Sequence, residues 1–105
     1  MDVIGKDKLD RCMRKHAEAR DQLAAWLAHV ENADWQKPED VQQDFGPDSI
    51  LPGSRAVFNI KGKKYRVVVV INYAMRIVFI RFAGTHDEYN KIDATKIQDG
   101  ISLWK

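Results

Sequence analysis

A histidine and a tyrosine stand three residues apart in the sequence Gly-Thr-His-Asp-Glu-Tyr at residues 84–89, immediately after an apolar segment. Thr85 and Glu88 have the types and spacing of a capping box, in which each side chain satisfies a free backbone N–H group at the start of a helix. A helical turn that begins after Thr85 places His86 and Tyr89 on one face. The imidazole can accept or donate a proton, and the phenol can position a substrate, stack on a base or pass a proton. Such a pair on a terminal turn is also a frequent packing and hydrogen-bonding feature, so the spacing alone leaves both interpretations open.

Basic residues dominate the sequence that precedes this turn. Residues 55–81 contain seven Lys and Arg and no acidic residue. The net charge of +2 hides this asymmetry, because residues 1–54 carry seven basic and eleven acidic residues, whereas residues 55–105 carry ten basic and four acidic ones. A solvated face normally mixes both signs, so an unbroken basic segment indicates binding of a polyanion, most simply a nucleic acid. The alternative is that these residues protect exposed strands from edge-to-edge aggregation.

Apolar periodicity predicts helices in the first half of the chain and strands in the second. A charged helix that starts at Lys6 and a second helix over about residues 18–33 form a helical hairpin or one bent helix. Pro38 begins a short third helix, which ends at Gly46. The later segments, rich in β-branched and aromatic residues, predict an antiparallel meander, and residues 3–4 predict a short first strand. The meander segments are Ala56–Ile60, Tyr65–Asn72 and Arg76–Gly84.

These elements indicate an α+β fold, with N-terminal helices packed on an antiparallel sheet and a short C-terminal helical turn. Alternation along the last strand puts Arg81 on the same face as Phe79, whereas Arg76 points the other way. One end of the sheet is therefore expected to bring Arg81, His86 and Tyr89 together.

Length and composition set the class of protein. We expect a single domain over residues 1–105, because a chain of this length buries enough surface to fold alone, and the 45% hydrophobic and 30% charged composition is that of a globular protein. The apolar run at residues 67–71 is too short to cross a bilayer, and Asp2 and a charged helix stand where a signal peptide would be basic and then apolar, so a cytoplasmic location is expected. A lone Cys12 supports neither an internal disulfide nor a metal site.

Histidines and tryptophans of the helical half have simpler interpretations. Trp26 and Trp35 are predicted to pack in the core or between helices. His16 and His29 lie among charged residues and are predicted to be surface histidines.

The sequences VFNIKGKKYRVVVVI and IVFIRFAGTHDEYNKID, with the first strand and ADWQKPEDV at residues 33–41, resemble the HigB family of bacterial toxins, within the RelE-like ribonuclease superfamily. The resemblance extends from Val3 to about Asp93. It implies a RelE-like single domain that acts as a ribosome-dependent mRNA endonuclease, the toxin of a type II toxin-antitoxin system. It also implies two partners, mRNA on the translating bacterial ribosome and a helix-turn-helix, HigA-like antitoxin protein.

The resemblance assigns roles to particular residues. It implies catalysis without metal or cofactor by the four side chains at the Thr-His-x-Glu-Tyr turn and on the two preceding strands, which are His86, Tyr89, Arg81 and Arg66. We expect contacts with RNA or the ribosome from five basic residues, Lys61, Lys63, Lys64, Arg76 and Lys91. Asn90 stands where an aspartate is common in the family, so an acidic group is not available at that position.

Other functions and two modes of inhibition stay open at this point. The chain could be a toxin of the same fold that binds a protein target such as gyrase without catalysis, or a plain RNA-binding module. An antitoxin could cover Arg66, Arg81 and His86 directly, or dock on the acidic helices and exclude the toxin from the ribosome by bulk. The charge asymmetry favours docking on the helices, because that surface is not needed for RNA.

Overall fold

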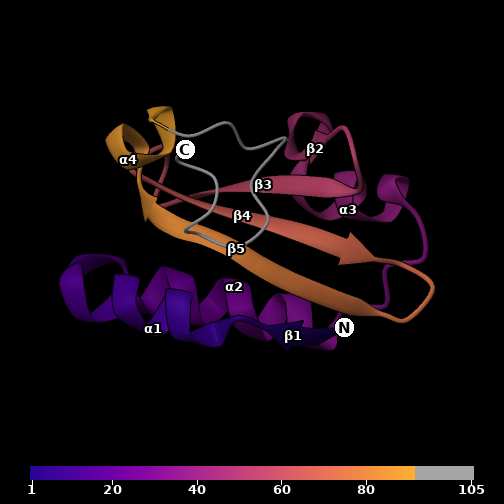
Figure 1. Cartoon of the computed structure of the whole chain (residues 1–105), viewed down its shortest axis with the longest axis horizontal. Helices are drawn as coiled ribbons and strands as arrows, with labels where there is room; N and C mark the ends of the chain where they lie inside the picture. Colours follow the sequence, from indigo (N-terminus) through magenta and orange to yellow (C-terminus); the bar gives the residue numbers. More distant parts are fainter. Residues whose placement is uncertain (92–105) are drawn as a thin grey trace.

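Five strands form one mixed sheet at the centre of the molecule (Figure 1). The computed structural model of the chain describes residues 1–91. Its strands are β1 (Asp2–Ile4), β2 (Ile50–Leu51), β3 (Arg55–Ile60), β4 (Tyr65–Asn72) and β5 (Ile77–Thr85). Their order in the sheet is β1-β5-β4-β3-β2, with β1 parallel to β5 and every other pair antiparallel. The predicted α+β class, meander and first strand are confirmed.

Two of the helices lie side by side across one face of the sheet (Figure 1). The helices are α1 (Lys6–Lys15), α2 (Arg20–Asn32), α3 (Pro38–Phe45) and α4 (His86–Asn90), with 3₁₀ turns at Ala17–Ala19 and Pro47–Ser49. The 3₁₀ turn at Ala17–Ala19 reverses the chain between α1 and α2, so the first two helices form a hairpin and not one bent helix. The opposite face of the sheet carries α4 at the end of β5.

The main core lies between this helical hairpin and the sheet. Leu9 from α1, Leu23 and Val30 from α2, and Val67 and Ile80 from β4 and β5 are all at most 1% exposed. Burial of apolar surface of this kind contributes roughly 25 cal/mol per Å² to folding. Both tryptophans predicted as core residues are buried, with Trp35 only 2% exposed and Trp26 4% exposed.

The segment between α3 and β3 is more ordered than its Gly, Pro and Ser content predicts. It contains the 3₁₀ turn at Pro47–Ser49 and the two-residue strand β2, which pairs with Arg55 and Ala56 of β3. Ser49 is 5% exposed and donates a hydrogen bond from its hydroxyl to the Gly46 carbonyl, 2.7 Å away. Turn propensity alone predicted a loop in this segment. The short strand depends on tertiary contacts, which local propensity does not reveal.

A β-bulge interrupts the pairing of β4 with β5. Val69 pairs with Ile80 and Val68 pairs with Phe82, so Arg81 is an extra residue in β5 without a partner in β4. The extra residue reverses the alternation that follows. Phe82 consequently packs with Val68 on the face opposite the helical hairpin, and Ala83 packs against the main core.

Gly5 allows α1 to follow β1 at close range to β5. Its φ of +93° is left-handed, and a Cβ atom built on it would lie only 2.6 Å from the Ile80 carbonyl oxygen. A side chain at this position would therefore strain the backbone and push α1 away from β5. The close approach of Gly5 to Ile80 therefore lets α1 pack against β5.

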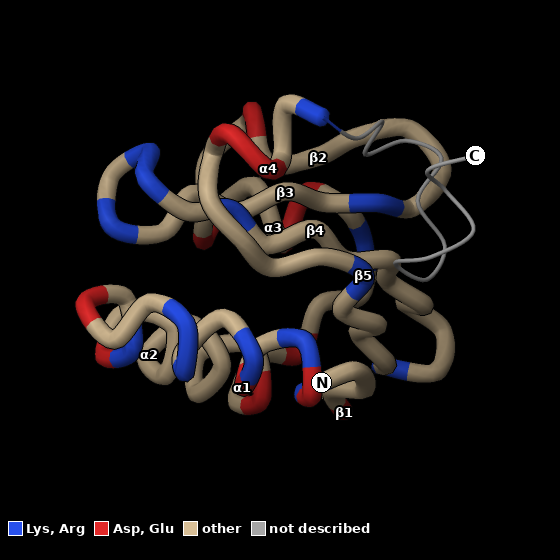
Figure 2. Tube along the Cα trace, turned by 60° about the vertical axis from the view of Figure 1, so that its left-hand side comes forward, with Lys and Arg blue, Asp and Glu red and all other residues tan. Residues whose placement is uncertain are grey.

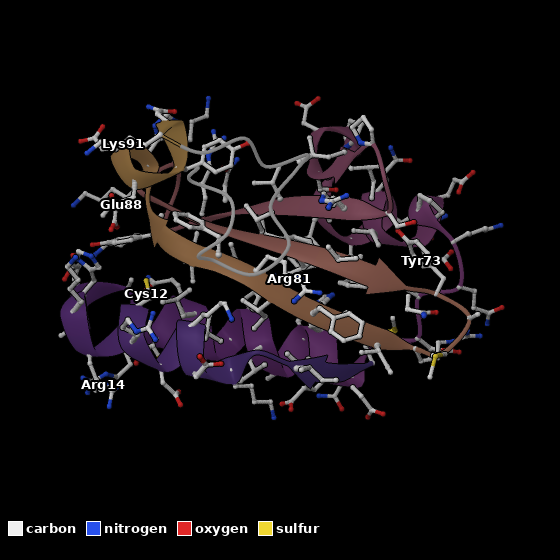
Figure 3. The ribbon with its side chains drawn as sticks, in the orientation of Figure 1. Cys12, Arg14, Tyr73, Arg81, Glu88 and Lys91 are labelled. Atoms are coloured by element: carbon white, nitrogen blue, oxygen red, sulfur yellow. The ribbon has the colours of Figure 1, made fainter. Side chains whose placement is uncertain are left out.

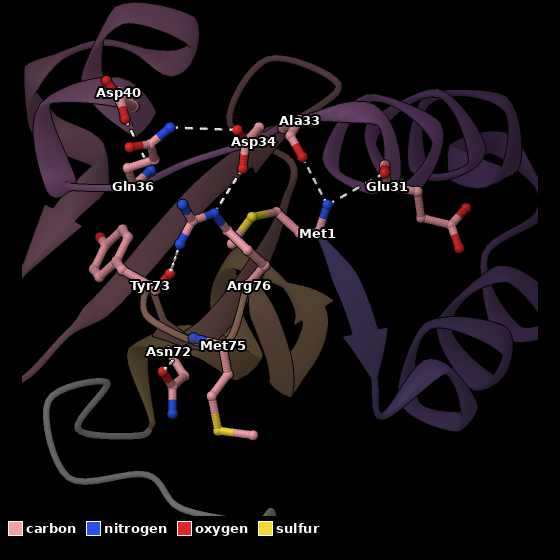
Figure 4. A network of polar contacts seen from close by, with 10 residues as sticks. All are labelled: Met1, Glu31, Ala33, Asp34, Gln36, Asp40, Asn72, Tyr73, Met75 and Arg76. Atoms are coloured by element: carbon pink, nitrogen blue, oxygen red, sulfur yellow. Dashed lines mark hydrogen bonds and ion pairs between the residues drawn. The ribbon is translucent and has the colours of Figure 1, made fainter.

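A polar network joins the helical half to the turn between β4 and β5 (Figure 4). Arg76 donates from Nε to the Asp34 carboxylate at 2.6 Å and from its terminal nitrogen to the Tyr73 carbonyl. The ion pair holds the pKa of Asp34 below its ordinary value, chiefly through that hydrogen bond. Asp34 lies after α2 and Arg76 lies before β5, so the network fixes the end of the sheet opposite α4.

Candidate functional site

The capping box predicted at Thr85 and Glu88 is present and sets the start of α4. The Thr85 backbone N–H donates to Glu88 Oε1 at 2.9 Å, and the Glu88 backbone N–H donates to Thr85 Oγ1 at 3.2 Å. The first of these hydrogen bonds is the main reason that the pKa of Glu88 lies below its ordinary value. A further backbone hydrogen bond of 2.9 Å, from His86 to the Lys64 carbonyl, ties α4 to the β3–β4 hairpin. His86 is therefore fixed relative to both strands that end beside it.

Arg66, Tyr89 and His86 lie together on the open face of the sheet. Arg66 pairs with Gly84 across β4 and β5, which brings its side chain beside α4. Its guanidinium carbon is 4.6 Å from the centre of the Tyr89 ring, and the rings of Tyr89 and His86 are 6.4 Å apart. Phe82 also packs against Tyr89, with ring centroids 6.4 Å apart, so the tyrosine contacts both a cation and an apolar neighbour.

The guanidinium of Arg66 has free hydrogen-bonding capacity. Within residues 1–91 its Nε atom is buried and has no hydrogen-bond partner, and no carboxylate forms an ion pair with it. Stacking on Tyr89 orients the plane of the guanidinium without using its N–H groups. An arginine held in this way is suited to bind a phosphate through two parallel hydrogen bonds.

Asn90 is the hydrogen-bond partner of the His86 ring. Its amide nitrogen lies 3.1 Å from His86 Nδ1, one helical turn along α4. An amide can donate through its nitrogen or, after rotation, accept through its oxygen, so Asn90 can pair with either state of the ring. Asn90 can thus orient the imidazole both before and after it takes up a proton.

Lysines of the β3–β4 hairpin form one wall of a groove beside His86. The groove is lined by Lys63, Lys64, Thr85, His86 and Asp87. Lys63 and Lys64 are exposed, and among the described residues neither has an acidic partner. Lys91 is also exposed and follows α4 directly (Figure 3).

Two other basic residues predicted for RNA binding are engaged elsewhere. Lys61 donates to the Glu18 carbonyl at 3.3 Å, on the side of the helical hairpin. Arg76 belongs to the polar network with Asp34, at the far end of β5 from His86.

Arg81 occupies a separate position on β5. As predicted, it lies on the face of Phe79, with its guanidinium carbon 5.2 Å from that ring. Its side chain also lines a hollow between α1 and the end of β5, and Figure 3 shows it near the middle of the strand. The contacts that join Arg66, Tyr89 and His86 do not include Arg81 within the described part of the chain.

His16 is not the surface histidine that the sequence predicted. Its side chain is 19% exposed, its ring packs on Tyr65 at a centroid distance of 5.1 Å, and its Nδ1 atom is 3.8 Å from the Glu18 carboxylate. The Tyr65 hydroxyl donates to the same carboxylate. Membership of the apolar stripe that includes Leu9 and Cys12 was the signal that could have identified it. By contrast, His29 is 47% exposed and hydrogen-bonded to Asp44, as a surface histidine should be.

Neither a metal-binding cluster nor a membrane-spanning helix is found among the described residues. Within residues 1–91, no three His, Cys, Asp or Glu side chains are grouped so that they could hold a metal ion. No helix in the same residues has the length and apolar character needed to cross a membrane.

A known protein family matches most of the chain. No curated protein matches the chain significantly. The profile of the HigB toxin family, described as the RelE-like toxic component of a toxin-antitoxin system, matches residues 19–92, which is more than half of the 105-residue chain. The matched region includes the entire meander, Arg66, His86 and Tyr89. This chain therefore belongs to the HigB family of RelE-like toxins, whose members function with an antitoxin partner.

Proposed function

We propose that this toxin is a metal-independent endoribonuclease that cleaves mRNA on the translating ribosome. The observation that supports the proposal best is the position of Arg66, which lies over the Tyr89 ring at 4.6 Å with N–H groups that are unpaired within residues 1–91, beside an imidazole on the open face of the sheet. A cation for the phosphate and a group that transfers protons are the two requirements of RNA cleavage through the 2′-hydroxyl.

In the proposed reaction, the 2′-oxygen attacks the adjacent phosphorus and its proton passes to a base. The bond from phosphorus to the 5′-oxygen breaks, and that oxygen takes a proton as it leaves. The products are a 2′,3′-cyclic phosphate and a 5′-hydroxyl end. Arg66 stabilises the negative charge that develops on the phosphate, because charge-assisted hydrogen bonds strengthen as that charge grows. His86, oriented by Asn90, transfers a proton, and Tyr89 positions the substrate and supports Arg66.

Lys63 and Lys64, which form one wall of the groove, favour the binding of a polyanionic substrate. Both ammonium groups line the groove that contains His86, so an RNA strand in the groove has cations beside its backbone. The groove itself is shallow and includes Asp87, and the ribosome would supply the orientation of the message that so small a surface does not. An RNA-binding module without catalysis would use the same lysines but would not need His86.

Growth arrest separates these functions. Expression of the chain without an antitoxin should arrest bacterial growth, and His86→Ala should relieve the arrest, since loss of a general acid or base slows a reaction by about 10²- to 10⁴-fold. His29→Ala is the matched control, because His29 is a surface histidine on α2. If the folded His86→Ala protein at equal abundance stayed as toxic as the parent, catalysis by this site would be refuted and a binding toxin favoured.

The RNA ends provide a second test. RNA recovered from ribosomes after a short exposure to the toxin should carry new 5′-hydroxyl ends within coding sequence. New 5′-phosphate ends would instead require water as the nucleophile and would refute the 2′-hydroxyl mechanism.

A further inference from the structure

A hollow of about 210 Å³ lies between α1 and the end of β5, apart from the cluster of Arg66, Tyr89 and His86. Its lining includes three basic residues of α1 and one of β5, which are Lys8, Arg11, Lys15 and Arg81. At roughly 30 Å³ for each water, the hollow has room for about seven waters, enough for a partly hydrated phosphate group. The sequence did not indicate a basic site here, because α1 belongs to the half of the chain in which acidic residues outnumber basic ones.

The helical repeat explains why basic residues gather here. Lys8, Arg11 and Lys15 are spaced by three and four residues, which puts them on one side of α1. Asp7 and Asp10 alternate with them in sequence and do not line the hollow. Figure 2 shows the resulting basic positions on α1 and on the β3–β4 hairpin, on either side of the end of the sheet that carries α4.

Little negative charge offsets these cations. Among residues 1–91, Glu88 is the one carboxylate in the lining, and its Oε1 atom accepts hydrogen bonds from the backbone N–H and the hydroxyl of Thr85. Its Oε2 atom lies 3.7 Å from Lys15. Burial, followed by the charge of Glu88, raises the pKa of the Cys12 thiol, so the cysteine stays neutral and adds no negative charge. Lys8, Arg11 and Arg81 have no ion-pair partner within residues 1–91.

Arg81 lines the hollow and has unused hydrogen-bonding capacity within residues 1–91. Its Nε atom is buried and lacks a hydrogen-bond acceptor among the described residues, and the β-bulge leaves it without a partner residue on β4. Contact with the Phe79 ring orients the guanidinium without consuming its N–H groups. A buried donor with no acceptor is costly unless a ligand satisfies it.

We infer that this hollow binds a backbone phosphate of the RNA, outside the scissile position, through Lys8, Arg11 and Arg81. The inference rests on the proposed function. RNA is favoured because the hollow and the groove of His86 adjoin the same short helix: Glu88 lines the first, and Thr85 and His86 line the second. A strand that follows the end of the sheet therefore passes both, and a second phosphate held there fixes its direction across the site.

Paired charge variants of the full chain test the inference. The affinity for a 2′-O-methyl RNA oligonucleotide, which lacks the attacking hydroxyl, is measured by fluorescence anisotropy over a range of salt concentrations. In Lys8→Gln/Arg11→Gln the slope of log affinity against log salt should become shallower by up to about 0.7, because each phosphate of a single strand that is neutralised contributes about 0.7 and the hollow holds one phosphate. The control Arg14→Gln/Arg20→Gln removes the same charge from exposed helical positions outside the hollow and should leave the slope unchanged. Figure 3 shows that Arg14 points away from the sheet, whereas Cys12 of the hollow points toward it.

The outcomes separate the possible failures. Equal changes of slope in the two double variants would reduce the effect to net charge and overturn the inference. An unchanged slope in Lys8→Gln/Arg11→Gln would also overturn it. In that case, NMR shifts of Cys12 and Gly84 amides on titration with inorganic phosphate would identify a site for free phosphate, and failure of the same variant to bind the antitoxin would identify a protein interface. If the unmodified chain neither bound RNA nor cleaved mRNA on the ribosome, the proposed function would fail together with the inference, whereas RNA binding and cleavage with no difference between the pairs would refute the inference alone.

Discussion

Arg66→Ala separates a contribution to catalysis from a contribution to stability. The substitution removes a guanidinium that lies 4.6 Å from the Tyr89 ring and has a buried Nε atom without a partner in residues 1–91. Removing a cation–π interaction at a partly exposed site costs about 0.5–1 kcal/mol. Removal of an unsatisfied buried donor has the opposite sign and a magnitude of about 1 kcal/mol or more. The two effects oppose each other, so Arg66→Ala should not lower the free energy of unfolding by more than about 1 kcal/mol.

The expected effect on the reaction is much larger. A donor directed at charge that develops in the transition state contributes about 10²- to 10³-fold to the rate. Arg66→Lys keeps the charge but loses both the fork of N–H groups and the stacking, so its rate should fall between those of the parent and Arg66→Ala. Cleavage is measured by primer extension on ribosomes programmed with a defined message, at saturating toxin, and stability is measured by thermal melting.

Arg14→Ala is the control, because Arg14 is an exposed cation on α1. A cleavage rate for Arg66→Ala that equals the control at saturation, with only a higher toxin concentration needed to reach it, would show that Arg66 binds RNA without stabilising the transition state. A large fall in melting temperature would show that the stacking with Tyr89 is structural. Either result would refute the reasoning that assigns Arg66 to the reacting phosphate.

Three further predictions concern stability and partner binding. Gly5→Ala should lower the melting temperature more than Gly62→Ala, because both positions have a positive φ but only at Gly5 would the new Cβ lie 2.6 Å from a backbone oxygen; equal shifts would contradict the close approach of α1 to β5. The depressed pKa of Glu88 means that its stabilisation is present above its ordinary pKa of 4.5 and is lost as the pH falls through the lower folded-state value. Thermal melts of Glu88→Gln should therefore be lower than the parent near neutrality and converge with it in more acidic buffer, and a constant difference would exclude the linkage. If the antitoxin docks on the helices and excludes the toxin from the ribosome by bulk, hydrogen exchange in the complex should be slowed at residues 6–33, a region that includes the basic side of α1, whereas protection confined to the strands and α4 would favour direct masking of the site.

The strands and the capping box could be predicted because their signals are local. Segments rich in valine and isoleucine predicted β3 to β5, and the threonine and glutamate at 85 and 88 predicted the start of α4. The strand β2 was not predictable, because two residues carry no periodicity and its pairing with Arg55 and Ala56 depends on the fold. Strength of local pattern thus decided which elements could be found.

The site was only partly predictable for a related reason. His86 and Tyr89 share a face through local helix geometry, and Arg66 reaches them through the pairing with Gly84, which depends on register. Simple alternation along β5 predicted correctly which face of the sheet Arg81 lies on. It did not predict that Phe82 lies on the face of Val68, because the bulge at Arg81 arises from tertiary pairing. The net charge of the first 54 residues also did not predict that the basic residues of α1 lie on one side of the helix, because a net charge does not say where the individual charges are.

The parallel pairing of β1 with β5 has a consequence for synthesis of the toxin. Asp2 pairs with Ile77 and Ile4 with Phe79, so each pairing joins residues 75 positions apart in the sequence. Contacts between distant residues form late in folding, because the closure of a long loop costs entropy before the contact stabilises it. A nascent chain on the ribosome cannot complete this sheet until residue 79 has been made and released from the tunnel. The turn that carries His86 follows directly, and the partly made toxin should therefore be inactive on the ribosome that synthesises it.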